Sequence, residues 1–97
     1  MHMAKRVIGT KKPDLNTPVN MRRLGQFVRF RRTSIGMTIE NAAGICGVSK
    51  QAFSNVESGL ETVKAETIFK VLNCLGVALW FSQNLSNGKT DESDEWL

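Results

Sequence analysis

The sequence contains little of the chemistry that enzymes use. Of its 97 residues, one is a histidine, two are cysteines and none is a tyrosine. The histidine, His2, lies in an N-terminal segment without helical periodicity, so it cannot form a catalytic pair on a rigid element. No glycine-rich phosphate loop and no metal-ligand spacing is present. We therefore expect no catalysis, no cofactor and no metal site.

Cysteines and long apolar runs are also scarce. Cys46 and Cys74 are too few for a disulfide framework, and both lie on apolar helix faces, where we expect unreactive core residues. No secretory signal is visible at the N-terminus. No apolar run approaches the roughly 20 residues that a membrane span needs. These absences favour a protein of a reducing, cytoplasmic compartment.

Charge is unevenly distributed along the chain. The formal net charge is +4, but residues 1–64 hold 11 Lys and Arg against 4 Asp and Glu, whereas residues 65–97 hold 2 against 5. A basic front half favours a polyanionic partner. Residues 1–16 show no apolar period and are predicted to form a flexible basic arm. Residues 85–97, rich in Ser, Asn and acids, are predicted to form a disordered acidic tail.

Residues 17–76 show the periodicity of an all-α domain. Apolar side chains recur at helical spacing, and capping residues and glycines divide them into four helices. The first helix is predicted over about 18–34, after a Thr17 cap, and Gly36 ends it. The others are predicted from Thr38 to Gly47, from Ser49 through about Val56, and over 64–75. The apolar run 77–81 is predicted to be a short strand within a segment 77–84.

The segment from Thr38 to Gly59 predicts the function. Its second and third helices are joined by a tight turn in which Gly47 can take a positive φ without strain. Ala43 is small enough to let the two helices cross closely. Cys46, Val48 and Phe53 supply an apolar contact between them. This combination is typical of a DNA-binding helix-turn-helix.

These residues resemble the lambda-repressor-like, Xre-type helix-turn-helix family. The resemblance covers about residues 18–80, and it implies a four-helix bundle that reads DNA. The motifs that carry it are Leu24-Gly25, Arg29, Arg31 and Arg32, Gly36-Met37-Thr38, Ala42-Ala43, Gly47-Val48-Ser49, Ser54, Glu57, Gly59 and Leu75-Gly76-Val77. One position departs from the family, because Ile39 replaces the usual glutamine that contacts the DNA backbone.

Within that family, the chain as a whole is similar to HipB-type antitoxins. The features are Lys50-Gln51-Ala52, the segment 67–72, the apolar strand 77–81 and a tail that ends in Trp96-Leu97. The resemblance implies a bacterial homodimer that represses its own operon and binds a HipA-type serine/threonine kinase toxin. A stand-alone Xre-type regulator without a toxin partner is the alternative. An adaptor that does not bind DNA is disfavoured by the basic front half.

In this fold the third helix enters the major groove, with its N-terminal residues nearest the base edges. Lys50 can donate to guanine or to phosphate, and Gln51 can pair with adenine. Thr38 and Ser49 lie where helix N-termini can hold phosphates. The expected DNA-binding residues of a palindromic operator complex are Thr38, Ser49, Lys50, Gln51, Ala52, Ser54 and Asn55.

Several side chains outside this helix are assigned other roles. Glu57 would repel phosphate, so we expect it to pair with Arg29 or Arg32. Phe27 and Phe30 either extend the core under the arm or mark a second contact surface.

The C-terminal third is predicted to serve assembly. The strand is apolar on both faces, so pairing with a second copy would bury it. The expected seam consists of Val77, Leu79, Trp80 and Phe81. Trp96 and Leu97 are expected to anchor in a partner's pocket or to mark the chain for degradation, unless they fold back onto the protein itself.

Overall fold

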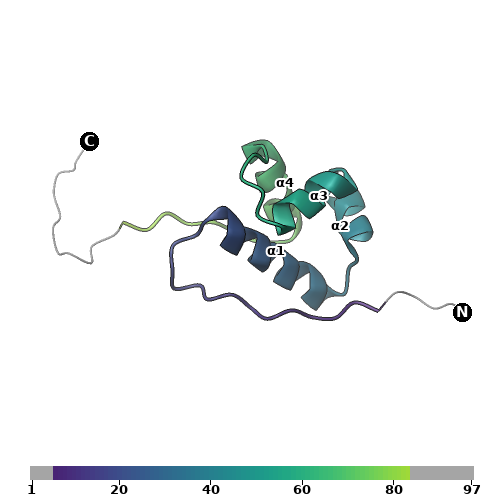
Figure 1. Ribbon diagram of the computed structural model, residues 1–97, viewed down its shortest axis with the longest axis horizontal. Coiled ribbons are helices and arrows are strands. Elements are labelled where there is room, and N and C mark those ends of the chain that lie inside the picture. Colours follow the sequence, from purple (N-terminus) through teal and green to yellow (C-terminus); the bar gives the residue numbers. More distant parts are fainter. Residues whose placement is uncertain (1–5, 84–97) are drawn as a thin grey trace, which may run out of the picture.

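The structure is a computed structural model, and it describes residues 6–83. Four α-helices follow one another along the chain: α1 (Met21–Ile35), α2 (Ile39–Cys46), α3 (Lys50–Glu57) and α4 (Ala65–Cys74). α1 packs mainly against α3, and α2 packs against α3 and α4 (Figure 1). The predicted all-α, four-helix architecture is therefore confirmed. Within the described range, no helix is long and apolar enough to cross a membrane.

Side-chain caps define the starts of α1, α2 and α3. Thr38 accepts a hydrogen bond from the backbone N–H of Asn41 at 3.1 Å, and Ser49 accepts one from Ala52 at 2.9 Å, as predicted. The predicted Thr17 cap of the first helix is wrong. The helix begins at Met21, because the Asn20 side chain accepts from the Arg23 N–H at 2.8 Å.

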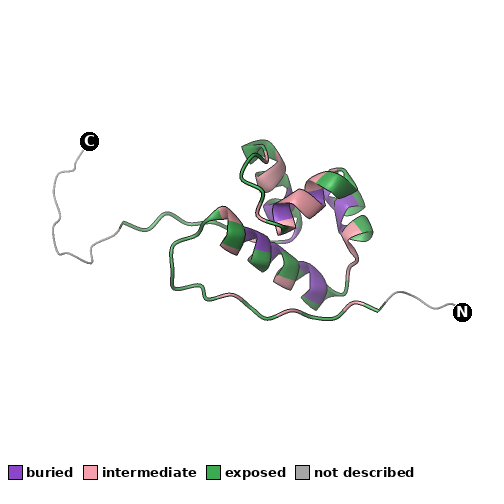
Figure 2. Ribbon diagram, viewed as in Figure 1, coloured by how far each residue is buried: buried purple, intermediate pink, exposed green. Residues whose placement is uncertain are grey.

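A small core joins the four helices. Val28 of α1, Phe53 and Val56 of α3 and Val71 of α4 are fully buried, and Figure 2 shows the buried side of α1 turned toward the other helices. Helical spacing from Leu24 and Val28 predicts that Ile35 is buried with them, but Ile35 is 44% exposed. It is the last residue of α1, directly before the left-handed Gly36, so it lies beyond the packed part of the helix.

The closest helix contact involves Gly25. A Cβ atom at this position would lie 2.5 Å from the carbonyl oxygen of Glu57 and would also clash with that of Val56. Only glycine lets the backbones of α1 and α3 approach this closely. The beginning of α1 is thereby placed against the end of α3.

The described part of the basic arm, residues 6–16, contains no helix or strand. It is hydrogen-bonded to α1 where the Thr10 N–H donates to Thr33 Oγ1 at 3.2 Å. Thr33 is itself buried near the end of α1. This contact holds the arm beside the helix (Figure 1).

The segment after α4 is not a strand in the single chain. Residues 77–83 take no regular secondary structure, whereas the sequence pattern predicts a strand over 77–81. The physical reason is that the described residues of one chain include no other strand with which this segment could pair. Residue 84 and the predicted tail 85–97 lie outside the described residues.

The two cysteines differ from the prediction. Cys46, the last residue of α2, and Cys74, the last residue of α4, form a disulfide with a Cα–Cα distance of 5.3 Å. Cys46 is buried, as expected, but Cys74 is exposed. The prediction of two unreactive core thiols was wrong, because periodicity within one helix does not show which side chains of two helices meet.

Candidate nucleic-acid interface

The turn between α2 and α3 fixes how the two helices are presented. Gly47 has a φ of +74°, in the left-handed region that glycine adopts without strain. The Val48 N–H donates to the Ala43 carbonyl at 3.1 Å, and the Val48 side chain packs against the core. Ala43 is only 3% exposed, so its small size allows the close crossing that the sequence predicted.

α3 has one buried side and one accessible side. Phe53 and Val56 anchor it in the core. Lys50 and Gln51 are exposed, and the other three predicted DNA-binding residues of this helix, Ala52, Ser54 and Asn55, are half-buried. The predicted reading residues thus come from the N-terminal two turns of a helix whose orientation is set by its buried side.

Gln51 and Asn55 are already connected to each other. Gln51 Nε2 donates to Asn55 Oδ1 at 2.9 Å, across one helical turn. The bond leaves the Gln51 Oε1 acceptor, its second N–H and the Asn55 amide group for a ligand. Together these groups form a short edge of donors and acceptors, the kind of edge that can match adenine in the major groove.

The start of α2 includes a polar side chain that the sequence prediction missed. Thr38 Oγ1 donates to Asn41 Oδ1 at 2.8 Å in addition to accepting from the Asn41 backbone. Its hydroxyl proton is therefore already engaged, whereas the exposed Asn41 amide group has N–H donors to offer. The Thr-x-x-Asn spacing, in which a polar residue occupies the third helical position after a cap, is the signal that could have identified Asn41.

Ile39 serves packing. It is half-buried and lies against the hydrophobic core. The position at which the resembled family usually has a DNA-contacting glutamine therefore contributes apolar contact here. Phosphate contacts near the start of α2 would depend on backbone N–H groups and on Asn41.

Glu57 forms the predicted ion pair, and its partner is Arg32. Arg32 Nε lies 2.5 Å from Glu57 Oε2, and Nη2 donates to Oε1 at 3.1 Å. The two side chains are 9% and 7% exposed, and Arg32 Nη1 also donates to the Met37 carbonyl at 2.7 Å. The carboxylate at the end of α3 is thus neutralised within the fold, which removes a charge that would repel DNA.

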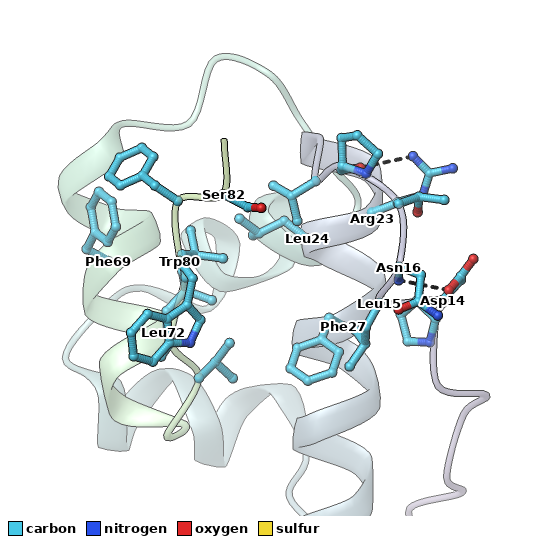
Figure 3. Close-up of a pocket in the computed structure, with 18 of the residues that line it drawn as sticks. Asp14, Leu15, Asn16, Arg23, Leu24, Phe27, Phe69, Leu72, Trp80 and Ser82 are labelled. Carbon is cyan, nitrogen blue, oxygen red and sulfur yellow. Dashed lines mark hydrogen bonds between the residues drawn. The ribbon is translucent and has the colours of Figure 1, made fainter. Parts of the chain in front are cut away.

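A second surface lies away from α3. An open apolar groove runs between α1, α4 and the segments that flank them, with Phe69 and Trp80 on one side and Leu15 and Phe27 on the other (Figure 3). Phe27 contacts Phe30, with ring centroids 5.7 Å apart. Phe27 lines this groove together with Leu15 of the arm, so both roles considered for Phe27 stay predictions.

The fold and this interface define a helix-turn-helix DNA-binding protein. A family model described as helix-turn-helix matches residues 28–79, more than half of the chain, and the chain belongs to this family. None of the curated proteins matches it.

Solved structures agree on the fold. A structure titled "HipB-O4 20mer complex" and one titled "Structure of HipA-HipB-O2-O3 complex" each superpose with a TM-score of 0.64 at 20% identity, over 71% of this chain and 97% of theirs. A structure titled "MDT Protein" matches with the same figures. The resemblance to a HipB-like, Xre-type fold is therefore confirmed.

Proposed function

We propose that the protein is a sequence-specific transcriptional repressor that inserts α3 into the major groove of a palindromic operator. The observation that supports it best is the accessible side of α3, where Lys50, Gln51 and Asn55 offer base-reading groups opposite a fully buried Phe53 and Val56. The N-termini of α2 and α3, capped by Thr38 and Ser49, would hold phosphates on either side. Ser54 and Ala52 would complete the contact.

The experiment compares a double substitution with a charge-matched control. Lys50→Ala/Gln51→Ala should weaken specific operator binding by roughly 10-fold or more, because each bidentate base contact contributes about 1–3 kcal/mol. Lys70→Ala removes the same charge from an exposed position on α4 and should leave the specificity unchanged. Fluorescence anisotropy would be measured on operator and scrambled DNA at one salt concentration. Equal losses on both DNAs would show that Lys50 and Gln51 contact phosphate only.

We further propose a homodimer whose seam includes Val77, Leu79, Trp80 and Phe81. Support comes from the exposure of the aromatic pair, since Trp80 is 86% exposed and Phe81 is fully exposed in the single chain. Pairing two copies of the segment would bury these side chains and satisfy their backbone groups.

If this seam forms the dimer, substitutions in it should change the sedimentation of the protein. Trp80→Ala/Phe81→Ala should convert a dimer at micromolar concentration into a monomer, with unchanged circular dichroism, because neither side chain contributes to the monomer core. Leu60→Ala, which truncates an exposed apolar residue in the loop after α3, is the matched control and should remain dimeric. A wild-type protein that sediments as a monomer would contradict the seam.

We propose, more specifically, that this repressor is the cytoplasmic antitoxin of a HipA-type kinase and represses its own operon. The fold likeness to structures titled with HipB and HipA supports this at the level of fold. Trp96 and Leu97, which lie outside the described residues, are proposed to bind the partner or to mark the chain for degradation. The alternative is a stand-alone regulator of the same family, which a kinase gene beside this one would disfavour.

Deleting residues 91–97 tests the role of the tail. Kinase binding or cellular half-life should change, whereas dimerisation and operator binding should stay near wild-type values, because the buried core of the described domain consists of residues between Leu24 and Leu75. Pull-down with the neighbouring kinase and a chase after blocked synthesis would measure both. A deletion that alters neither would remove the proposed role, and one that unfolds the dimer would show that Trp96 packs on its own chain.

A further inference from the structure

Cys46 and Cys74 lie at two structurally important points. Cys46 ends α2 directly before the turn glycine Gly47, and Cys74 ends α4 directly before the segment that leads to Trp80. Their Cα atoms are 5.3 Å apart, within the range that a disulfide spans without backbone movement. The fold itself therefore brings the two sulfurs together.

The two cysteines differ in access to solvent. Cys46 is 8% exposed and belongs to the core cluster, whereas Cys74 is exposed. A small oxidant or reductant would therefore meet the sulfur of Cys74 first. This asymmetry, one accessible and one resolving cysteine, is typical of redox-responsive pairs.

We propose that Cys46 and Cys74 form a reversible thiol–disulfide site, and that its redox state sets the resistance of the domain to unfolding. The inference goes beyond the proposed DNA-binding function and does not depend on it. In reducing compartments, disulfides of this kind are usually transient and redox-sensing, whereas framework disulfides persist in oxidising ones.

Oxidation by a low-molecular-weight disulfide, such as oxidised glutathione, would proceed in two exchanges. The Cys74 thiol loses its proton, and its sulfur attacks the glutathione disulfide, so that a mixed disulfide forms and one glutathione leaves as the thiol. The Cys46 thiol then loses its proton and attacks Sγ of Cys74, which expels the second glutathione. One small disulfide is reduced to two thiols while the protein dithiol becomes the disulfide.

The disulfide would change the stability of the domain more than its folded structure. The ring it closes spans a sequence separation of 28 residues and contains the turn, all of α3 and all of α4. Closing a ring of this size restricts mainly the unfolded chain. In the folded domain, α3 and α4 also meet through the core, in which Phe53, Val56 and Val71 are fully buried. The reduced protein should therefore fold in the same way but unfold more readily.

The test uses the full chain in mixtures of oxidised and reduced glutathione, followed by acid quenching, alkylation with N-ethylmaleimide and mass spectrometry. Oxidised protein should carry no alkyl group and reduced protein two. The oxidised form should melt about 10 °C or more higher. Full alkylation after oxidation, disulfide-linked dimers, or equal melting temperatures would each overturn the proposal.

Two single variants test the order of the exchange. Cys46→Ser should accumulate the glutathione adduct at Cys74, because the resolving thiol is absent. Cys74→Ser, a change at an exposed position, should fold normally, resist adduct formation at the buried Cys46, and melt at one temperature in both buffers. A Cys74→Ser protein that still shows the redox-dependent shift would contradict the site, even if Cys46→Ser failed to fold.

Discussion

Replacing Glu57 with leucine is expected to lower the free energy of unfolding by about 3–5 kcal/mol, because it leaves a buried guanidinium without its counter-charge. The Arg32 side chain is 9% exposed and donates hydrogen bonds to two partners, the Glu57 carboxylate and the Met37 carbonyl. The carbonyl alone cannot neutralise the charge. Urea unfolding followed by circular dichroism would measure the loss, with the slope of the transition checked for two-state behaviour.

Two further variants separate the unpaired charge from the other effects of the substitution. Glu61→Gln removes an exposed carboxylate from the loop after α3 and should change stability by less than about 0.5 kcal/mol. The double change Arg32→Met/Glu57→Leu removes both charges and should recover part of the loss, since apolar pairs often replace buried ion pairs well. If the double variant were less stable than Glu57→Leu alone, the unpaired charge would not be the cause.

Gly25→Ala adds a single methyl group and is expected to lower the free energy of unfolding by about 1–3 kcal/mol or more, the largest loss expected from such an addition in the domain. The new Cβ would lie 2.5 Å from the Glu57 carbonyl oxygen, and Val56 places a second carbonyl in the same space. Neither oxygen belongs to a flexible side chain. α1 and α3 would therefore have to move apart, which would also disturb the Arg32–Glu57 pair. Thermal and urea unfolding of the variant would show the loss.

Gly44→Ala provides the matched control. Gly44 is also helical, but a Cβ there would meet nothing within 4 Å. Alanine should therefore stabilise α2 by about 0.5–1 kcal/mol through its higher helix propensity. Opposite signs for the two Gly→Ala changes would support the close contact of α1 and α3. A neutral or stabilising Gly25→Ala would show that the helices do not meet there.

The parts of the fold that depend on local sequence could be predicted. Thr38 and Ser49 cap their helices as expected, and Gly47 takes the left-handed turn, because each role is fixed by a few neighbouring residues. The predicted start of α1 was wrong, because Thr17-Pro18 and Asn20 are both typical of a helix N-terminus. Asn20 forms the hydrogen bond.

Features that depend on distant residues were harder to predict. The disulfide joins residues that are 28 positions apart, and the Thr10–Thr33 hydrogen bond joins residues 23 apart. Helical periodicity reports on residues within one helix, so it predicts neither of these two contacts. The strand predicted over 77–81 requires a second strand that the described chain does not supply.

The exposure of the candidate reading residues could be predicted from the sequence, whereas their contacts with DNA stay a prediction. The sequence predicts Lys50 and Gln51 on the outer side of the third helix, and the structure places them on the accessible side of α3. The sequence left Arg29 and Arg32 as possible partners of Glu57. Which of them forms the ion pair depends on how α1 crosses α3, and only the structure shows this. Asn41 was missed because its role emerges only from the hydrogen bonds around Thr38.

Whether α3 reads a DNA sequence is tested most directly by letting the full chain select bound duplexes from a random DNA library, followed by sequencing. If two copies of α3 read DNA in a symmetric dimer, one palindrome should be enriched, with half-sites centred about one helical turn apart, or a multiple of it. The same selection with Lys50→Ala/Gln51→Ala should lose or alter the half-site sequence. Enrichment of no sequence, or of the same palindrome by wild type and variant, would contradict DNA reading by α3.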